Sequence, residues 1–174
     1  MAPLINLEEH VVRWGEIAKR KSPFRPRDMQ LPRFERERYV VLGRPHEATP
    51  GGPRTIENDH FTMVCITAEP GKGFASHAHS TVESFIVLSG HFRCTSGDQS
   101  VEVGPWDVVH VPPDLFHDLV NIGSETGVVM AINAGKHGAP ITLDPKVLKE
   151  LEAIGRKPES AVELPPHAPG KGGC

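Results

Sequence analysis

Residues 71–90, GKGFASHAHSTVESFIVLSG, contain two histidines and a glutamate at short spacing. In an extended strand the side chains alternate between two faces, so His77 and His79 would project from the same side. Glu83 follows four residues later, and imidazole nitrogens and carboxylate oxygens are common ligands of transition metals. The segment therefore predicts part of a metal site, which needs a further ligand and an apolar wall behind it.

His117 is the candidate for the further ligand. It begins the run HDLVN, forty residues after His77, which suits a different strand of the same barrel. A histidine on the inner face of a barrel must be hydrogen-bonded or bound to a metal. Three neutral imidazoles and one carboxylate favour Fe(II), Mn(II), Ni(II), Co(II), Cu(II) or Zn(II) over calcium or magnesium. Histidines that are only hydrogen-bonded in the core are the alternative.

The chain that must position these ligands is rich in short β-type runs. From residue 38 onward, eight runs are separated by Gly, Pro, Asp or Asn: RYVVLG, FTMVCITA, ESFIVLSG, HFRCTS, QSVEV, DVVHV, HDLVN and GVVMAIN. Such spacing predicts an all-β sandwich or barrel over residues 38–143. The sequence SGDQ at 96–99 predicts a tight hairpin turn within it.

Helical and irregular segments flank the predicted barrel. Residues 6–21 place apolar side chains near helical spacing behind Asn6, which predicts one amphipathic helix with the stripe Leu7, Val11, Trp14 and Ile17. Prolines make residues 22–37 an irregular basic arm, so 1–37 is an N-terminal extension. The loop 43–59, rich in Gly and Pro, is a candidate lid.

A second helix is predicted after the barrel, over residues 144–155. Asp144 is its expected N-cap, Pro145 lies in its first turn, and Gly155 follows its last turn. Its expected apolar face is Leu148, Leu151 and Ile154. Residues 156–174 are rich in Pro and Gly without periodicity and are expected to form a mobile tail.

Composition excludes several classes of protein. The 174 residues contain no run of about 18 apolar residues and no secretory signal, which favours a cytoplasmic protein without a membrane span. Three scattered cysteines argue against a disulfide framework, and Cys65 and Cys94 are expected to be buried thiols. The basic block 19–27 lacks a recognition helix or aromatic ladder, so we expect a solvated arm and no nucleic-acid binding.

The histidine segment resembles the first motif of the cupin family, G-x5-H-x-H-x3-E-x6-G. All its fixed positions are present: Gly71, His77, His79, Glu83 and Gly90. The second motif, G-x5-P-x-G-x2-H-x3-N, is similar to the segment with Pro112, His117 and Asn121, but Trp106 and Asp114 replace its two glycines. We expect Asp114 to adopt a left-handed conformation, and Gly104 with Pro105 to make the turn in place of Trp106.

The resemblance implies a double-stranded β-helix, a jelly-roll barrel, with one metal held by His77, His79, Glu83 and His117. By similarity to single-domain cupin dioxygenases, it implies an Fe(II)-dependent enzyme that uses dioxygen to cleave a C–C bond in a small phenolic, hydroxyketone or diketone substrate. Glu83 is either a permanent ligand or a catalytic base. The barrel runs offer only Arg93, which is expected outside, to hold a phosphosugar.

Two other functions stay open. A non-redox isomerase, epimerase or lyase would use Mn(II), Ni(II) or Zn(II) as a Lewis acid. A ligand-sensing module would normally add a helix-turn-helix segment, for which residues 6–21 are too short. The apolar stripe on 6–21 needs a partner surface, which predicts a homodimer or a helix folded back on its own barrel.

Side-chain parity also suggests which residues line a substrate pocket. Phe85 and Val87 share parity with Glu83, and Leu119 and Asn121 share parity with His117. These four are the predicted pocket residues, with ordinary core packing as the alternative. Because imidazole must be neutral to bind a metal, occupancy is expected to fall as the pH drops through roughly 6.5.

Overall fold

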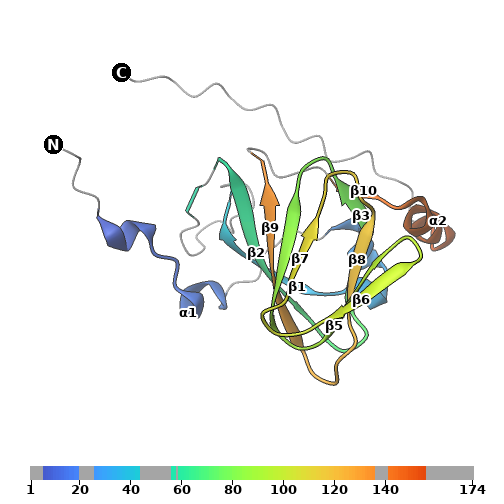
Figure 1. Cartoon of the computed structure of the whole chain (residues 1–174), viewed down its shortest axis with the longest axis horizontal. Coiled ribbons are helices and arrows are strands. Elements are labelled where there is room, and N and C mark those ends of the chain that lie inside the picture. Colours follow the sequence, from blue (N-terminus) through green and yellow to red (C-terminus); the bar gives the residue numbers. More distant parts are fainter. Residues whose placement is uncertain (1–5, 20–25, 44–55, 58, 136–140, 156–174) are drawn as a thin grey trace, which may run out of the picture.

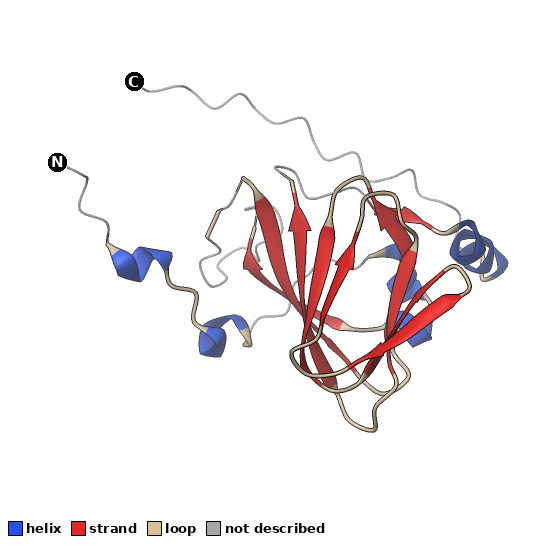
Figure 2. Cartoon of the chain, in the orientation of Figure 1, coloured by secondary structure: helices blue, strands red, loops and turns tan. Residues whose placement is uncertain are grey.

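Ten strands form two antiparallel sheets that face each other (Figures 1 and 2). The structure is a computed structural model that describes residues 6–19, 26–43, 56–57, 59–135 and 141–155. One sheet has the order β1-β2-β9-β4-β7 and the other β10-β3-β8-β5-β6. The strands are β1 Glu37–Leu42, β2 Phe61–Ala68, β3 Gly73–His79, β4 Glu83–Ser89, β5 Phe92–Ser96, β6 Gln99–Val103, β7 Val108–Val111, β8 His117–Asn121, β9 Gly127–Ala134 and β10 Ile141–Leu143. This arrangement confirms the predicted all-β barrel.

All eight predicted runs are strands, and the structure adds β3 and β10. The sequence of β3, GFASHAH, is built largely from Gly, Ala and Ser, which have low β-propensity, so composition alone did not mark it as a strand. The β5–β6 hairpin turns at the predicted place. Ser96 pairs with Gln99, and Gly97 between them has a φ of +61°.

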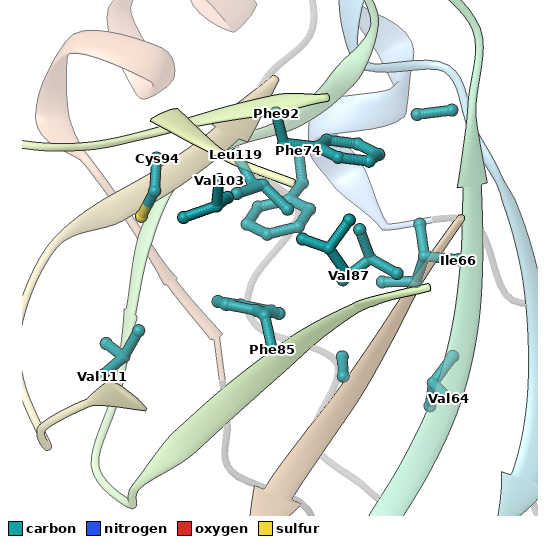
Figure 3. Close-up of a cluster of buried hydrophobic side chains, with 13 residues drawn as sticks. Val64, Ile66, Phe74, Phe85, Val87, Phe92, Cys94, Val103, Val111 and Leu119 are labelled. Atoms are coloured by element: carbon teal, nitrogen blue, oxygen red, sulfur yellow. The ribbon is translucent and has the colours of Figure 1, made fainter. Parts of the chain in front are cut away.

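The hydrophobic core lies between the two sheets (Figure 3). The register places Val64, Ala131 and Phe85 side by side on one inner face. Phe74, Phe92 and Leu119 point toward them from the other sheet (Figure 3), and each of these three is at most 3% exposed. Inner and outer positions alternate along the strands except at the register shifts in β1, β3 and β4.

A second apolar cluster lies outside the barrel, against the back of β3. Its buried members come from the N-terminal arm, β3 and the C-terminal helix: Leu31, Phe34, Ala75, Val147 and Leu151. The arm contains two short 3-10 helices, η2 Arg27–Gln30 and η3 Pro32–Phe34, and the helix is α2 Pro145–Ala153. Figure 1 shows α2 beside β3 and β10. The strand that carries two predicted ligands is therefore packed on both faces.

The C-terminal helix α2 begins and ends as predicted. The Asp144 carboxylate accepts the Lys146 N–H at 2.8 Å, Pro145 is the first helical residue, and Gly155 has a φ of +75°. The buried face differs from the predicted one. Val147 and Leu151 face the second cluster, whereas Ile154 remains 51% exposed.

The single N-terminal helix predicted over residues 6–21 does not form in the described part. The segment contains a 3-10 helix, η1 Leu7–His10, and one α-helical turn, α1 Trp14–Ile17. The Asn6 side chain does not cap the helix but donates to the Glu9 carboxylate. Helices this short are marginal without packing, and Ile17 is the only stripe residue that is buried. No described helix is long and apolar enough to span a bilayer.

The outer face of the first sheet carries an apolar row from edge to edge. The register aligns Tyr39, Cys65, Met130, Ile86 and Val108 across its five strands. Trp14 packs edge-on against Tyr39, with ring centroids 5.5 Å apart.

Cys65 and Cys94 are both buried as free thiols, as predicted. Homodimer formation and a cytoplasmic location stay predictions.

Gly73 tests how closely β3 and β8 pack. A Cβ on Gly73 would lie 1.9 Å from the Leu119 carbonyl oxygen, whereas a Cβ on Gly15 would meet no atom within 4 Å. We expect Gly73→Ala to destabilise the fold by about 3 kcal/mol or more, because two paired backbones must separate. Gly15→Ala is the matched control and should leave the denaturant midpoint unchanged. Equal midpoints for the two variants would contradict the close pairing.

Candidate metal centre

Three histidines and one glutamate converge inside the barrel. The Nε2 atoms of His77 and His79 are 3.1 Å apart, and Glu83 Oε2 lies 3.2 Å from His79 Nε2 and 3.8 Å from His77 Nε2. The ligand atoms of these three residues all lie within 4.8 Å of one another. His117 reaches the group through Glu83, with Nε2 at 3.0 Å from Oε2. All four residues are at most 7% exposed.

A β-bulge in β3 aims His77 into the barrel. Phe74 pairs with Leu119 and His77 pairs with His117, so two residues of β3 face only one of β8, namely Asp118. In a regular strand, Phe74 and His77 would point to opposite faces, because they are three residues apart. The bulge turns both inward, and their rings lie 5.3 Å apart. Beyond the bulge the alternation resumes, and His79 follows His77 to the same side, as the sequence predicts.

The turn before β8 fixes the position of His117 relative to β3. Asp114 has a φ of +63°, as predicted, and its backbone N–H donates to the His79 carbonyl at 2.7 Å. The expectation for Trp106 is wrong. Trp106 itself adopts a φ of +73°, while its N–H donates to the Val87 carbonyl and its side chain is 77% exposed. Both glycine positions of the second motif thus keep the left-handed backbone with other residues.

Backbone carbonyls fix the tautomers of two histidines. His77 Nδ1 lies 2.7 Å from the Ala75 carbonyl, and His117 Nδ1 lies 2.9 Å from the Leu115 carbonyl. A carbonyl can only accept a hydrogen bond, so each Nδ1 carries the proton. In the neutral rings Nε2 therefore presents a lone pair to the centre of the group.

These lone pairs make the group a fit for a cation. With its ring neutral, His117 turns the lone pair of Nε2 toward the Glu83 carboxylate at 3.0 Å, and His77 turns that of its Nε2 toward His79 Nε2 at 3.1 Å. The first of these contacts joins two acceptors, which is repulsive unless a positive charge lies between them. Two ligand atoms bound at right angles to one ion, each about 2.1 Å from it, would be about 3 Å apart. Imidazole nitrogens with one carboxylate suit a divalent transition metal.

Burial controls the protonation of the group. Desolvation lowers the pKa of His77 to about 4, so this ring is neutral at physiological pH and its Nε2 is free to bind a metal. Burial acts to raise the pKa of Glu83, but hydrogen bonds with His117 and His79 outweigh it. They hold the pKa of the carboxyl far below its usual range. Glu83 is therefore an anion at neutral pH.

Aromatic rings close the group on its core side. Phe74 contacts His77 and lies 5.1 Å from Phe85, whose ring is 5.6 Å from that of His117. Sequence reasoning did not single out Phe74, because the bulge reverses its parity relative to the histidines. These rings keep water away from one side of the ligand atoms.

The four predicted pocket residues are all in the buried interior. Phe85 adjoins His117, whereas Val87 and Leu119 pack deeper in the core. The Asn121 amide donates to the Ala68 and Glu125 carbonyls and accepts the Gly123 N–H, so it ties together backbone of neighbouring segments. A contact of any of these residues with substrate stays a prediction.

Asn133 is a polar residue at the site that sequence reasoning missed. It pairs with Glu83 across β4 and β9, and its Nδ2 lies 3.4 Å from His79 Nε2. Its parity with the buried residues Val129 and Ala131 was the available signal. An amide here can hydrogen-bond a ligand held beside the four side chains.

Other histidines and the predicted outward Arg93 lie away from the group or outside the described residues. His91 pairs with Glu102 at the surface, and His110 is exposed, so neither lines the centre. Arg93 is exposed, as predicted. His46, His137 and most of the proposed lid 43–59 lie outside the described residues. A cavity of about 490 Å³ elsewhere is bordered by the arm, and among its charged lining residues Lys72 pairs with both Glu35 and Glu69.

Comparison with known proteins identifies the barrel. The family model described as "Cupin domain" matches residues 64–133, which run from β2 to β9 and include all four converging side chains. The barrel is a cupin domain. The chain is thus a small member of the cupin superfamily, and the double-stranded β-helix expected from the resemblance is confirmed.

Solved cupins share the fold. A Klebsiella pneumoniae protein with a double-stranded β-helix domain is 22% identical, with 70% of this chain and 96% of that one covered and a TM-score of 0.51. A deletion mutant of the Bacillus subtilis oxalate decarboxylase is 20% identical, with 73% and 31% covered and a TM-score of 0.53. The Ruegeria pomeroyi DMSP lyase DddQ is 20% identical, with 70% and 56% covered and a TM-score of 0.51. At these identities the likeness shows the fold alone.

A curated relative is similar only in part. The mannose-1-phosphate guanylyltransferase of Salmonella typhimurium is 33% identical over 79 residues, which is 45% of this chain. The match spans only 16% of that protein's length. Since most of the transferase lies outside the match, its activity does not transfer to this cupin.

Metal binding tests the ligand set directly. His117→Ala should reduce occupancy by a divalent transition metal at least tenfold, because a buried ligand is removed and Glu83 loses its nearest partner. His91→Ala, at an exposed histidine, is the matched control and should bind about one metal per chain. Elemental analysis after dialysis measures both. Full occupancy in His117→Ala would remove this residue from the ligand set.

The metal-free protein should lose stability in acid because of His77. Its folded pKa of about 4 lies below the unfolded value of 6.5, so the unfolded state binds more protons between these pH values. Stability is present above pH 6.5 and is lost as the pH falls toward 4, by on the order of 1–3 kcal/mol. His77→Gln should flatten this part of the profile in urea unfolding. An unchanged slope would contradict the buried neutral histidine.

Proposed function

We propose that this cupin is a mononuclear metal enzyme, and that its reaction is an Fe(II)-dependent dioxygenation that cleaves a C–C bond in a small phenolic, hydroxyketone or diketone. The observation that carries the proposal is the convergence of four acceptor groups in a buried site. His77 and His117 hold their Nδ1 protons on carbonyls and turn lone pairs inward. Such a set binds a redox-active ion, which would supply electron transfer to dioxygen or Lewis acidity.

Charge favours an anionic substrate. Glu83 is the only carboxylate of the group, and its salt-bridge partners are all histidines. With neutral imidazoles, a divalent ion would keep one uncompensated positive charge in an apolar barrel. A phenolate, an enolate or an enediolate would neutralise it, which matches the proposed substrates.

The surrounding residues would orient the substrate and exclude water. Phe74 and Phe85 shield the core side of the group. The Asn133 amide lies next to His79 and could donate to a substrate oxygen. None of these three side chains carries charge, so substrate binding would rely on shape, hydrogen bonding and the charge at the centre.

A non-redox lyase or isomerase is the second candidate. It is favoured by the position of Glu83, a carboxylate among three histidines that could accept a substrate proton if it is not itself a ligand. Several structural neighbours are described as a lyase, a cyclase and a decarboxylase, so the fold accommodates such reactions.

Metal replacement in the presence and absence of air separates the two candidates. We expect the metal-free protein to consume oxygen in step with a catechol or diketone after Fe(II) is added, and to remain inactive with Zn(II). An oxygen electrode and product analysis measure this. His117→Ala loaded under the same conditions is the control for free iron. Undiminished product formation in an anaerobic chamber would overturn the dioxygenase in favour of the lyase or isomerase.

A further inference from the structure

We infer that the N-terminal arm, residues 26–36, is a positioning element of the metal centre. Its residues Asp28 and Arg36 hold the β-bulge of β3 in the conformation that aims His77 into the barrel. The inference rests on the metal site of the proposed function but not on the reaction. It concerns residues that contact neither the ligand atoms nor a substrate.

Side chains take the place of a neighbouring strand along the edge of β3. β10 pairs with β3 only from His77 to His79. At the bulge, the Asp144 N–H donates to the Ser76 carbonyl at 2.9 Å, and the Ser76 hydroxyl donates to Asp144 at 3.0 Å. Backbone groups of a bulge would otherwise lack partners.

The arm supplies the remaining partners at this edge. The Asp28 carboxylate accepts the Ala75 N–H at 3.0 Å, and Arg36 Nη1 lies 3.3 Å from the Gly73 carbonyl. Together with Asp144, these groups continue the pairing of β3 beyond the end of β10. The bulge is thus fixed by charged side chains from a segment 47 residues earlier in the chain.

Asp28 and Arg36 form a buried ion pair. Arg36 donates to the two carboxylate oxygens at 2.9 and 3.2 Å, and the side chains are only 6% and 4% exposed. Apolar residues of the arm, such as Leu31 and Phe34, already anchor it to the barrel. Because a buried pair is often replaceable by apolar residues without loss of stability, anchoring does not require these charges. What apolar residues cannot supply is the acceptor for the Ala75 N–H.

Ala75 connects the arm to the ligand. Its N–H is held by Asp28, and its carbonyl accepts the Nδ1 proton of His77 at 2.7 Å. A shift of this residue would remove the group that fixes both the tautomer and the ring plane of His77. Partners of this kind outside the ligand set typically change metal affinity by about 10–100-fold.

The variant that tests the inference replaces both charges. Asp28→Leu combined with Arg36→Met keeps side-chain size and leaves no unpaired charge, so the fold should stay stable. We expect its affinity for Co(II) to fall at least tenfold, and the visible absorption of bound Co(II), which reports ligand geometry, to change. The imidazole ¹⁵N signals of His77 in the metal-free protein should show loss of the fixed Nδ1–H.

Arg33→Ala is the matched control. Arg33 forms an exposed ion pair with Glu150, so it also joins the arm to α2, but it has no part in the bulge. This variant should keep the Co(II) affinity, the spectrum and the His77 signals of the natural protein. If the double variant does not fold, Asp28→Ala provides the comparison, since it removes the acceptor of the Ala75 N–H without adding bulk.

The outcomes separate the arm from the proposed function. A double variant with unchanged affinity, spectrum and His77 signals overturns the positioning role while the metal site stands. A natural protein that binds no Co(II) overturns the metal site, and the metal-free ¹⁵N signals then still decide whether Asp28 and Arg36 set the tautomer of His77.

Discussion

The ionised carboxylate of Glu83, enclosed by three imidazoles inside an apolar barrel, is the constraint on which the rest of the structure depends. Moving a carboxylate out of water costs several kcal/mol even after relaxation. Among the described residues, the basic side chains beside its carboxylate are His77, His79 and His117, at 3.8, 3.2 and 3.0 Å. The site is therefore stable only if those rings are held at the correct height and rotation, and the surrounding backbone does this.

β3 is the strand through which the positions of His77 and His79 are controlled. Its inner face carries Phe74, His77 and His79 toward the core between the sheets, and its outer face places Ala75 in the cluster formed by the arm and α2. The bulge is what allows one short strand to serve both clusters. If the arm has the positioning role proposed above, a change on the outer face of β3 would reach His77 through the backbone of Ala75.

The sequence predicted the barrel and the converging residues because both depend on local patterns. Alternation places His77 and His79 together, and turn residues separate the eight runs that became strands. It did not predict the partners that lie far apart in the chain. Asp28 meets Ala75 across 47 residues, and Asn133 meets His79 across 54, and no periodicity links such pairs.

Local patterns also gave wrong predictions where the conformation of a segment depends on its contacts with the rest of the fold. Residues 6–21 have helical spacing, yet Val11 and Val12 are β-branched and the segment buries only Ile17 among its stripe residues, so nothing stabilises a long helix. Trp106 takes a left-handed backbone that its residue type disfavours, because its N–H and the Asp107 carbonyl both pair with Val87. In each case tertiary contacts outweigh residue preference.

The four predicted ligands and the residues that support them are constrained differently. This difference bears on how one cupin barrel can carry different reactions. The ligand positions follow from strand alternation and leave little freedom, since a one-residue shift would turn a histidine to the opposite face. Asn133 at the end of β9 and the arm behind β3 are under no such restriction, because neither is a ligand. In the proposed enzyme, changes at these places would alter substrate orientation or ligand geometry while the four side chains stay as they are. Its chemistry would then be tuned by residues that the ligand motifs do not contain.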